Sequence, residues 1–73
     1  MKEYQESYQE CWARRIIWAY KKLQDEGKKF YWSDVRKIAG VKKHNFKEIK
    51  PYLSKHADTK MVEAIIAMVG EFE

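Results

Sequence analysis

The sequence is poor in residues that cross-link or interrupt secondary structure. Its 73 residues include one cysteine, one proline and three glycines. A single Cys11 excludes an internal disulfide and leaves no second thiol for a cysteine-based metal cluster. No apolar run approaches the roughly 18–20 residues that span a bilayer, and residues 1–6 lack the apolar core of a secretory signal. We therefore expect a cytoplasmic protein with no membrane partner.

The sequence also lacks the common signatures of catalysis and metal binding. His44 and His56 are twelve residues apart, and Cys11 is distant from both, so the spacing does not match that of metal ligands. No nucleophile elbow, phosphate-binding loop or paired-carboxylate motif is present. We therefore expect that the protein is not an enzyme and uses no cofactor and no metal ion.

Aromatic and basic residues, by contrast, are abundant. Aromatic residues make up 15% of the chain, charged residues 36%, and the net charge is +4. This composition indicates a globular chain, and its length predicts one domain, residues 1–73, with a small core. Between residues 28 and 60, ten lysines and arginines stand against three acidic residues. Such a concentration of charge permits a polyanionic partner.

Apolar periodicity predicts an all-α fold, a small bundle of four or five helices. The first helix is expected from about residue 3 to residue 26 and is ended by Gly27. Its inward face is predicted to consist of Tyr8, Trp12, Ile16, Ala19 and Leu23. A second stripe, Tyr4, Cys11 and Trp18, repeats every seven residues, or nearly two turns. We expect this stripe to contact a fourth helix or a second subunit.

The middle of the chain is predicted to form a helix-turn-helix over about residues 33–50. Ser33 is a suitable N-cap for its first helix, whose inward residues are Val35, Ile38 and Ala39. Gly40 supplies the turn, and Val41 fills the corner between the helices. The second helix is expected to begin near Lys42 or Lys43 and to face inward with Phe46, Ile49 and Leu53. It is expected to stop at Lys50, because Pro51 disfavours a helical residue before it, and Pro51 then opens a short turn through His56.

The last helix is expected over about residues 59–72, with Asp58 as its N-cap. Its apolar arc spans roughly 200°, which is wider than the stripe of a surface helix. Such a helix either lies centrally in the monomer or buries one side against another chain. We expect a homodimer, and the residues expected at a dimer or partner surface are Tyr4, Cys11, Trp18, Val62, Ile66 and Val69.

The segment "IAGVKKHNFKEIKPYL" resembles the recognition segment of the tri-helical, homeodomain-like regulators, especially the tetracycline-repressor family. The corner Ala39-Gly40-Val41 and the aromatic Phe46 carry the resemblance. The sequence departs from that pattern at three positions, where Arg36 replaces a small alanine, Lys42 a Ser or Thr cap, and Lys50 an inward aromatic residue. The large ligand-binding domain of that family is absent, so its regulation by small molecules is not carried over.

The resemblance implies that helix 43–50 enters the major groove of double-stranded DNA. It implies that Lys43, His44 and Lys47 face base edges, with Lys42, Asn45 and Lys50 nearer the phosphates. Further backbone contacts are expected from Ser33, Arg36, Lys37, Tyr52 and Lys55. A protein of this size would suit a transcriptional regulator or accessory factor of a phage, plasmid or mobile element.

Two other interpretations remain open at the level of sequence. The chain could be a protein-binding module, such as a virus-encoded inhibitor or an adaptor, whose contacts are the aromatic residues Tyr4, Trp18, Tyr20 and Tyr31. A basic outer face can also be only a solubilising surface. Glu48 lies in the middle of the expected reading face and is unfavourable near phosphates.

Overall fold

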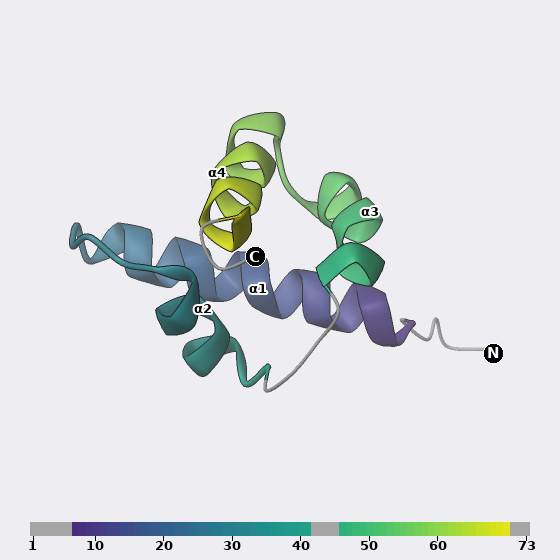
Figure 1. The fold of residues 1–73 in the computed structure, drawn as a ribbon, viewed down its shortest axis with the longest axis horizontal. Helices are drawn as coiled ribbons and strands as arrows, with labels where there is room; N and C mark the ends of the chain where they lie inside the picture. Colours follow the sequence, from purple (N-terminus) through teal and green to yellow (C-terminus); the bar gives the residue numbers. More distant parts are fainter. Residues whose placement is uncertain (1–6, 42–45, 71–73) are drawn as a thin grey trace, which may run out of the picture.

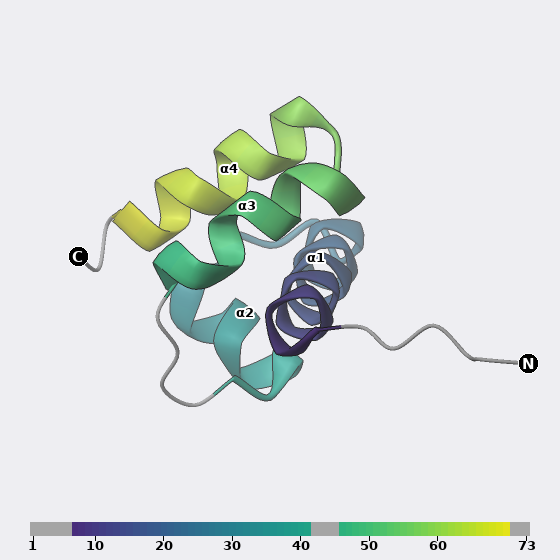
Figure 2. The ribbon, with the colours of Figure 1, turned by 90° about the vertical axis from the view of Figure 1, so that its right-hand side faces the viewer.

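The residues that the structure describes form four helices, of which the first is the longest. The computed structural model describes residues 7–41 and 46–70. In these ranges it contains α1 (Tyr8–Asp25), α2 (Trp32–Ala39), α3 (Phe46–His56) and α4 (Thr59–Gly70), and no strand. α1 packs against both α2 and α3, and α4 packs against α3 and α2 (Figure 1). The view in Figure 2 shows α3 and α4 side by side and running in opposite directions. The all-α prediction is confirmed.

All four helices contribute to one hydrophobic core. The largest side chains that are removed from solvent are Ile16, Val35, Ile49, Leu53 and Ile65. Every inward residue that the sequence predicted for α2 and α3 belongs to this cluster or packs against it, as does Val41 at the corner. The core therefore joins all four of these helices.

The buried face of α1 is rotated from the predicted one. Ile16 and Ala19 are fully buried as expected, but Tyr8 is 61% exposed. The prediction missed Ala13, Ile17 and Tyr20, which are buried. Because α1 contacts two helices, its apolar arc is centred between them and not on the stripe of large aromatic residues.

A capping box fixes the start of α1. The Ser7 hydroxyl accepts a hydrogen bond from the Glu10 amide (3.1 Å), and the Glu10 carboxylate accepts one from the Ser7 amide (3.2 Å). Ser7 is extended, with φ −68° and ψ 163°, so a continuous helix from about residue 3 is wrong. The sequence signal was the Ser-x-x-Glu pattern. At the other end, Gly27 has φ +67°, as its predicted capping role requires.

Helix α2 begins at Trp32, two residues before the start that a Ser33 cap would give, and the predicted Gly40 caps its end. Its N-cap is Tyr31, whose amide donates to the Asp34 carboxylate (3.0 Å). Ser33 therefore lies inside the first turn, and the prediction that it caps the helix is wrong. Gly40 has φ +79°. The amide of Val41 donates to the Arg36 carbonyl (3.0 Å), as in a Schellman motif.

Helix α3 runs through its proline. The prediction placed a helix end at Lys50, but the helix continues through Pro51 to His56. Leu53 is fully buried and Ile49 is 1% exposed. Burying one such side chain contributes roughly 1.5–3 kcal/mol, comparable with the cost of about 3 kcal/mol for a proline inside a helix. Keeping Ile49 and Leu53 on one continuous stripe therefore offsets the cost of Pro51.

Helix α4 starts as predicted. The Asp58 carboxylate accepts a hydrogen bond from the Met61 amide (2.9 Å), which confirms Asp58 as the cap. Val62, Ile65 and Val69 are buried in the single chain. The wide apolar arc is thus largely satisfied within the monomer. The predicted extension to residue 72 reaches past Gly70 and lies outside the described residues.

Candidate nucleic-acid interface

The outward face of α3 is basic. Phe46, Ile49 and Leu53 are turned into the core, and a helix that buries one stripe exposes the opposite one. The exposed residues of α3 include Lys47, Lys50 and Lys55, together with the acidic Glu48. Three cations and one anion over eleven residues give this helix a positive outer surface. The sequence predicted all three lysines as contact residues.

Tyr52 lies at the edge of this surface. It is half-buried against the core, and the Lys55 Nζ lies 4.9 Å from the centroid of its ring. This cation–π contact holds the lysine over the tyrosine.

The first part of the predicted recognition segment cannot be placed. Lys42, Lys43, His44 and Asn45 lie outside the described residues. They join α2 to α3, because Val41 is the last described residue before them and Phe46 is the first after them.

The residues predicted on the preceding helix have different exposures. Ser33 and Lys37 are exposed on α2, and Arg36 is half-buried. The Trp32 and Phe46 rings pack edge to face, with centroids 5.5 Å apart. This contact brings the N-terminal end of α2 to the N-terminal end of α3. Ser33 and Lys47, the next residue in each helix, therefore belong to neighbouring helix ends.

A helix-turn-helix turn contains 3–4 residues. Ala39 ends α2 and Phe46 is the first described residue of α3, so the length of the turn depends on residues 42–45, which lie outside the described residues. Of the predicted base-reading positions, Lys47 lies in the described part of α3.

A second basic surface lies on α1, and the sequence analysis missed its charge. Trp18 is 55% exposed, although the stripe of Tyr4, Cys11 and Trp18 was expected to contact a fourth helix or a second subunit. Cys11 is half-buried beside Trp18. The cationic residues near Trp18 are Arg14, Arg15, Lys21 and Lys22, all exposed. We refer to these four residues and Trp18 as the Trp18 face. A helical wheel of α1 would have shown this grouping, because positions three and four apart share a face.

The residues predicted at a dimer surface are not brought together. Val62 and Val69 are 9% and 4% exposed and pack in the core of the single chain. They are therefore corrected from surface to core residues, while Ile66 is half-buried. Tyr4 lies outside the described residues. Among the described members of the predicted set, Trp18 alone presents a large exposed side chain.

The aromatic residues predicted to bind a protein partner also differ in their solvent exposure. Trp18 and Tyr31 are exposed, at 55% and 46%. Tyr20 is buried and packs edge to face with Phe30, with ring centroids 5.4 Å apart, so its predicted exposure is wrong. Its role is structural.

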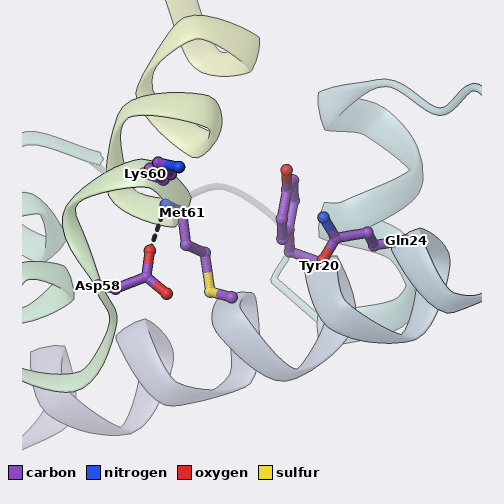
Figure 3. Close-up of a pocket in the computed structure, with 5 residues that line it drawn as sticks. All are labelled: Tyr20, Gln24, Asp58, Lys60 and Met61. Atoms are coloured by element: carbon purple, nitrogen blue, oxygen red, sulfur yellow. Dashed lines mark hydrogen bonds between the residues drawn. The ribbon is translucent and has the colours of Figure 1, made fainter.

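A hollow of about 270 Å³ lies between the C-terminal half of α1 and the start of α4 (Figure 3). Its lining residues are Tyr20, Gln24, Asp58, Lys60 and Met61. The carboxylate of Asp58 is engaged in capping α4 through the Met61 amide. These five side chains do not form a nucleophile and base pair.

Other kinds of site receive no support from residues 7–41 and 46–70. No group of three or more His, Cys, Asp or Glu residues in these ranges could hold a metal ion. No helix there is both long and apolar enough to cross a bilayer. Comparison of the chain with protein-family models, with curated proteins and with solved structures finds no match.

Proposed function

We propose that this domain binds double-stranded DNA, as a small regulator or accessory factor, through the outward face of α3. The observation that carries the proposal is that α3 has a buried apolar face and an exposed basic face. Its apolar residues Phe46, Ile49 and Leu53 are buried, and Lys47, Lys50 and Lys55 are exposed. Phosphate contacts supply most of the affinity of such proteins for DNA.

The predicted helix-turn-helix belongs to this proposal. The left-handed Gly40 and the buried Val41 are features that such a corner needs, and the lysines that precede α3 in sequence extend its charge. The proposal rests on the exposed cations of α3 and not on the exact crossing of the helices. Lysines act as point charges without the planar fork of arginine. We therefore expect affinity that depends only weakly on base sequence.

A salt titration with a labelled duplex tests the proposal. Each phosphate that the protein neutralises should steepen the fall of log K with log salt by about 0.9. A flat response, or no binding at low salt, would refute duplex binding.

A double variant locates the site. Lys47→Ala with Lys55→Ala should weaken duplex binding and reduce the salt slope by about one unit for each lysine. Lys60→Ala is the matched control, because Lys60 is an exposed lysine on α4, outside the α3 surface. Equal effects of the double variant and the control would remove α3 from the proposed interface.

A further inference from the structure

Trp18 stands at the centre of the solvent face of α1. At about 100° per residue, it points roughly 180° away from the middle of the arc formed by Ala13, Ile16 and Tyr20, which are buried. The other two tryptophans, Trp12 and Trp32, pack against or within the core. Intramolecular packing therefore accounts for two of the three indoles and leaves the third in solvent.

Cations flank Trp18 symmetrically along the helix. Arg14 and Arg15 precede it by four and three residues, and Lys21 and Lys22 follow it by three and four. Each pair is centred about 5 Å from Trp18 along the helix axis. Residues 11–22 contain no acidic residue. The indole is therefore bracketed by positive charge on both sides.

The contacts of these cations show how the face is arranged. The Lys22 Nζ lies 5.2 Å from the centroid of the Trp18 ring. The Arg15 guanidinium lies over the Trp12 ring, 4.9 Å from its centroid, so it contributes charge from a fixed position. Lys22 is on a flexible stem, and a flat ligand that displaced it from the indole would leave its ammonium beside the ligand.

Shallow hollows lie on both sides of the exposed indole. Besides Trp18, the first is lined by Cys11, Arg14 and Arg15. Besides Trp18, the second is lined by Arg14, Ile17, Lys21 and His56, the last contributed by α3. Each hollow combines the indole with at least two cationic side chains. Both can accept a group that is partly flat and apolar and partly anionic.

We propose that the Trp18 face binds single-stranded nucleic acid. A base stacks on the Trp18 indole, and the phosphates on its two sides meet Arg14 and Arg15 in one direction and Lys21 and Lys22 in the other. Binding of this kind combines a positive surface with an exposed aromatic ring and tolerates many sequences. The surface is separate from the α3 lysines, so the inference goes beyond the proposed function and does not depend on it.

A second copy of the chain fits this surface poorly. In a two-fold symmetric contact the same patch meets itself, so Arg14, Arg15, Lys21 and Lys22 would face their own copies. Like charges opposed in this way are costly.

An acidic protein segment would match the charge but not the shape. The Trp18 ring projects from the middle of a helix face and is 55% exposed, and a run of acidic side chains offers it no flat ring to stack on. A strand of nucleotides supplies what this arrangement lacks, namely a flat ring for the indole and an anion on either side of it. Single-stranded nucleic acid is therefore the occupant that the geometry favours.

Two oligomers of about 20 nucleotides, longer than the binding sites of common single-strand binding folds, test the proposal. One is oligothymidine and the other is an abasic strand with the same number of phosphates, each carrying a fluorescent label for anisotropy. The wild-type protein should bind oligothymidine more tightly than the abasic strand. Trp18→Ala should lower the affinity for oligothymidine by about 5- to 150-fold, the range that stacking of one base supports, and should leave the abasic strand almost unchanged.

Two further variants separate stacking from other effects. Trp18→Phe keeps an aromatic ring and should retain most of the preference for oligothymidine. Tyr31→Ala is the matched control, because Tyr31 is also exposed beside a cation, with the Lys29 Nζ 5.7 Å from its ring centroid, but it lies outside the Trp18 face. The proposal is overturned if Trp18→Ala binds oligothymidine like the wild type, or if Tyr31→Ala loses as much affinity.

Competition identifies the occupant. Unlabelled oligothymidine and polyglutamate each compete with the labelled oligothymidine. If polyglutamate displaces the labelled strand as effectively as unlabelled oligothymidine does, the proposal is overturned and an acidic protein partner is indicated. The result is also independent of duplex binding. The double variant Lys47→Ala with Lys55→Ala should change the oligothymidine affinity of the Trp18 face by no more than about twofold. Trp18→Ala should leave the duplex salt slope unchanged, because it removes no charge and each charge removed changes that slope by about one unit.

Discussion

Replacing Pro51 with alanine should stabilise the protein. Pro51 is exposed and is the sixth residue of α3. Its ring nitrogen cannot donate to the carbonyl of Lys47, four residues earlier, and the ring crowds that carbonyl. Alanine would restore the hydrogen bond without touching the core, because neither Ile49 nor Leu53 changes.

The expected gain follows from three contributions. A restored backbone hydrogen bond contributes about 1 kcal/mol net. The full helix-propensity difference between alanine and proline, about 3 kcal/mol, sets the upper limit. The unfolded chain regains freedom when proline is removed, which costs about 0.4–1 kcal/mol. We expect the free energy of unfolding to rise by about 1–2 kcal/mol, and the melting temperature of a domain of this size to rise by about 4–8 °C per kcal/mol.

Thermal unfolding followed by circular dichroism measures this effect. Lys50→Ala is the matched control, because Lys50 is exposed in the same helix and its helix propensity is close to that of alanine. It should shift the midpoint by only a degree or two, since the propensity difference is a few tenths of a kcal/mol. An unchanged or lower midpoint for Pro51→Ala would mean that α3 is not continuous through residue 51. The helix end that the sequence predicted at Lys50 would then be correct.

Three other predictions concern the caps and the oligomeric state. Gly40→Ala should lower the free energy of unfolding by about 1–2 kcal/mol, because Gly40 has φ +79°. Gly40→Asn should lower the free energy of unfolding by less. Chemical denaturation measures both variants, and equal stability of Gly40→Ala and the wild type would contradict the left-handed conformation at Gly40. Ser7→Ala should cost about 1 kcal/mol through loss of the hydrogen bond from the Glu10 amide, whereas Ser7→Asp should preserve stability; a loss of the same size in both would exclude the cap as its cause. Sedimentation equilibrium should give the mass of a monomer, because Val62 and Val69 are buried within the chain, and a dimer mass at micromolar concentration would contradict this.

The sequence predicted the elements whose signals are local. Gly27 and Gly40 end helices where expected, and Asp58 caps α4. The end of α3 could not be predicted in the same way. The local signal of Pro51 favours a break, and only the burial of Leu53 against the rest of the domain overrides it.

The candidate sites show a similar limit. The lysines of α3 were found because they lie together in sequence, in a segment of high positive charge. The Trp18 face was only half predicted. Trp18 was assigned to a stripe expected to contact a fourth helix or a second subunit, but Arg14 and Lys21 were not connected with it, because they lie four and three residues away from it in the linear sequence. Val62 was predicted at a dimer surface because the width of an apolar arc does not show whether the same chain or another chain covers the helix.

The central place of α1 has a consequence during protein synthesis. Ile16 on α1 and Leu53 on α3 belong to the same core cluster, yet about 40 residues separate them along the chain. At 5–20 residues per second, the ribosome takes roughly 2–8 s to add that stretch. Helical domains with mostly local contacts fold in microseconds to milliseconds. The newly made α1 therefore waits with its apolar face uncovered for far longer than the domain takes to fold, and a chaperone has more opportunity to bind α1 than any later helix.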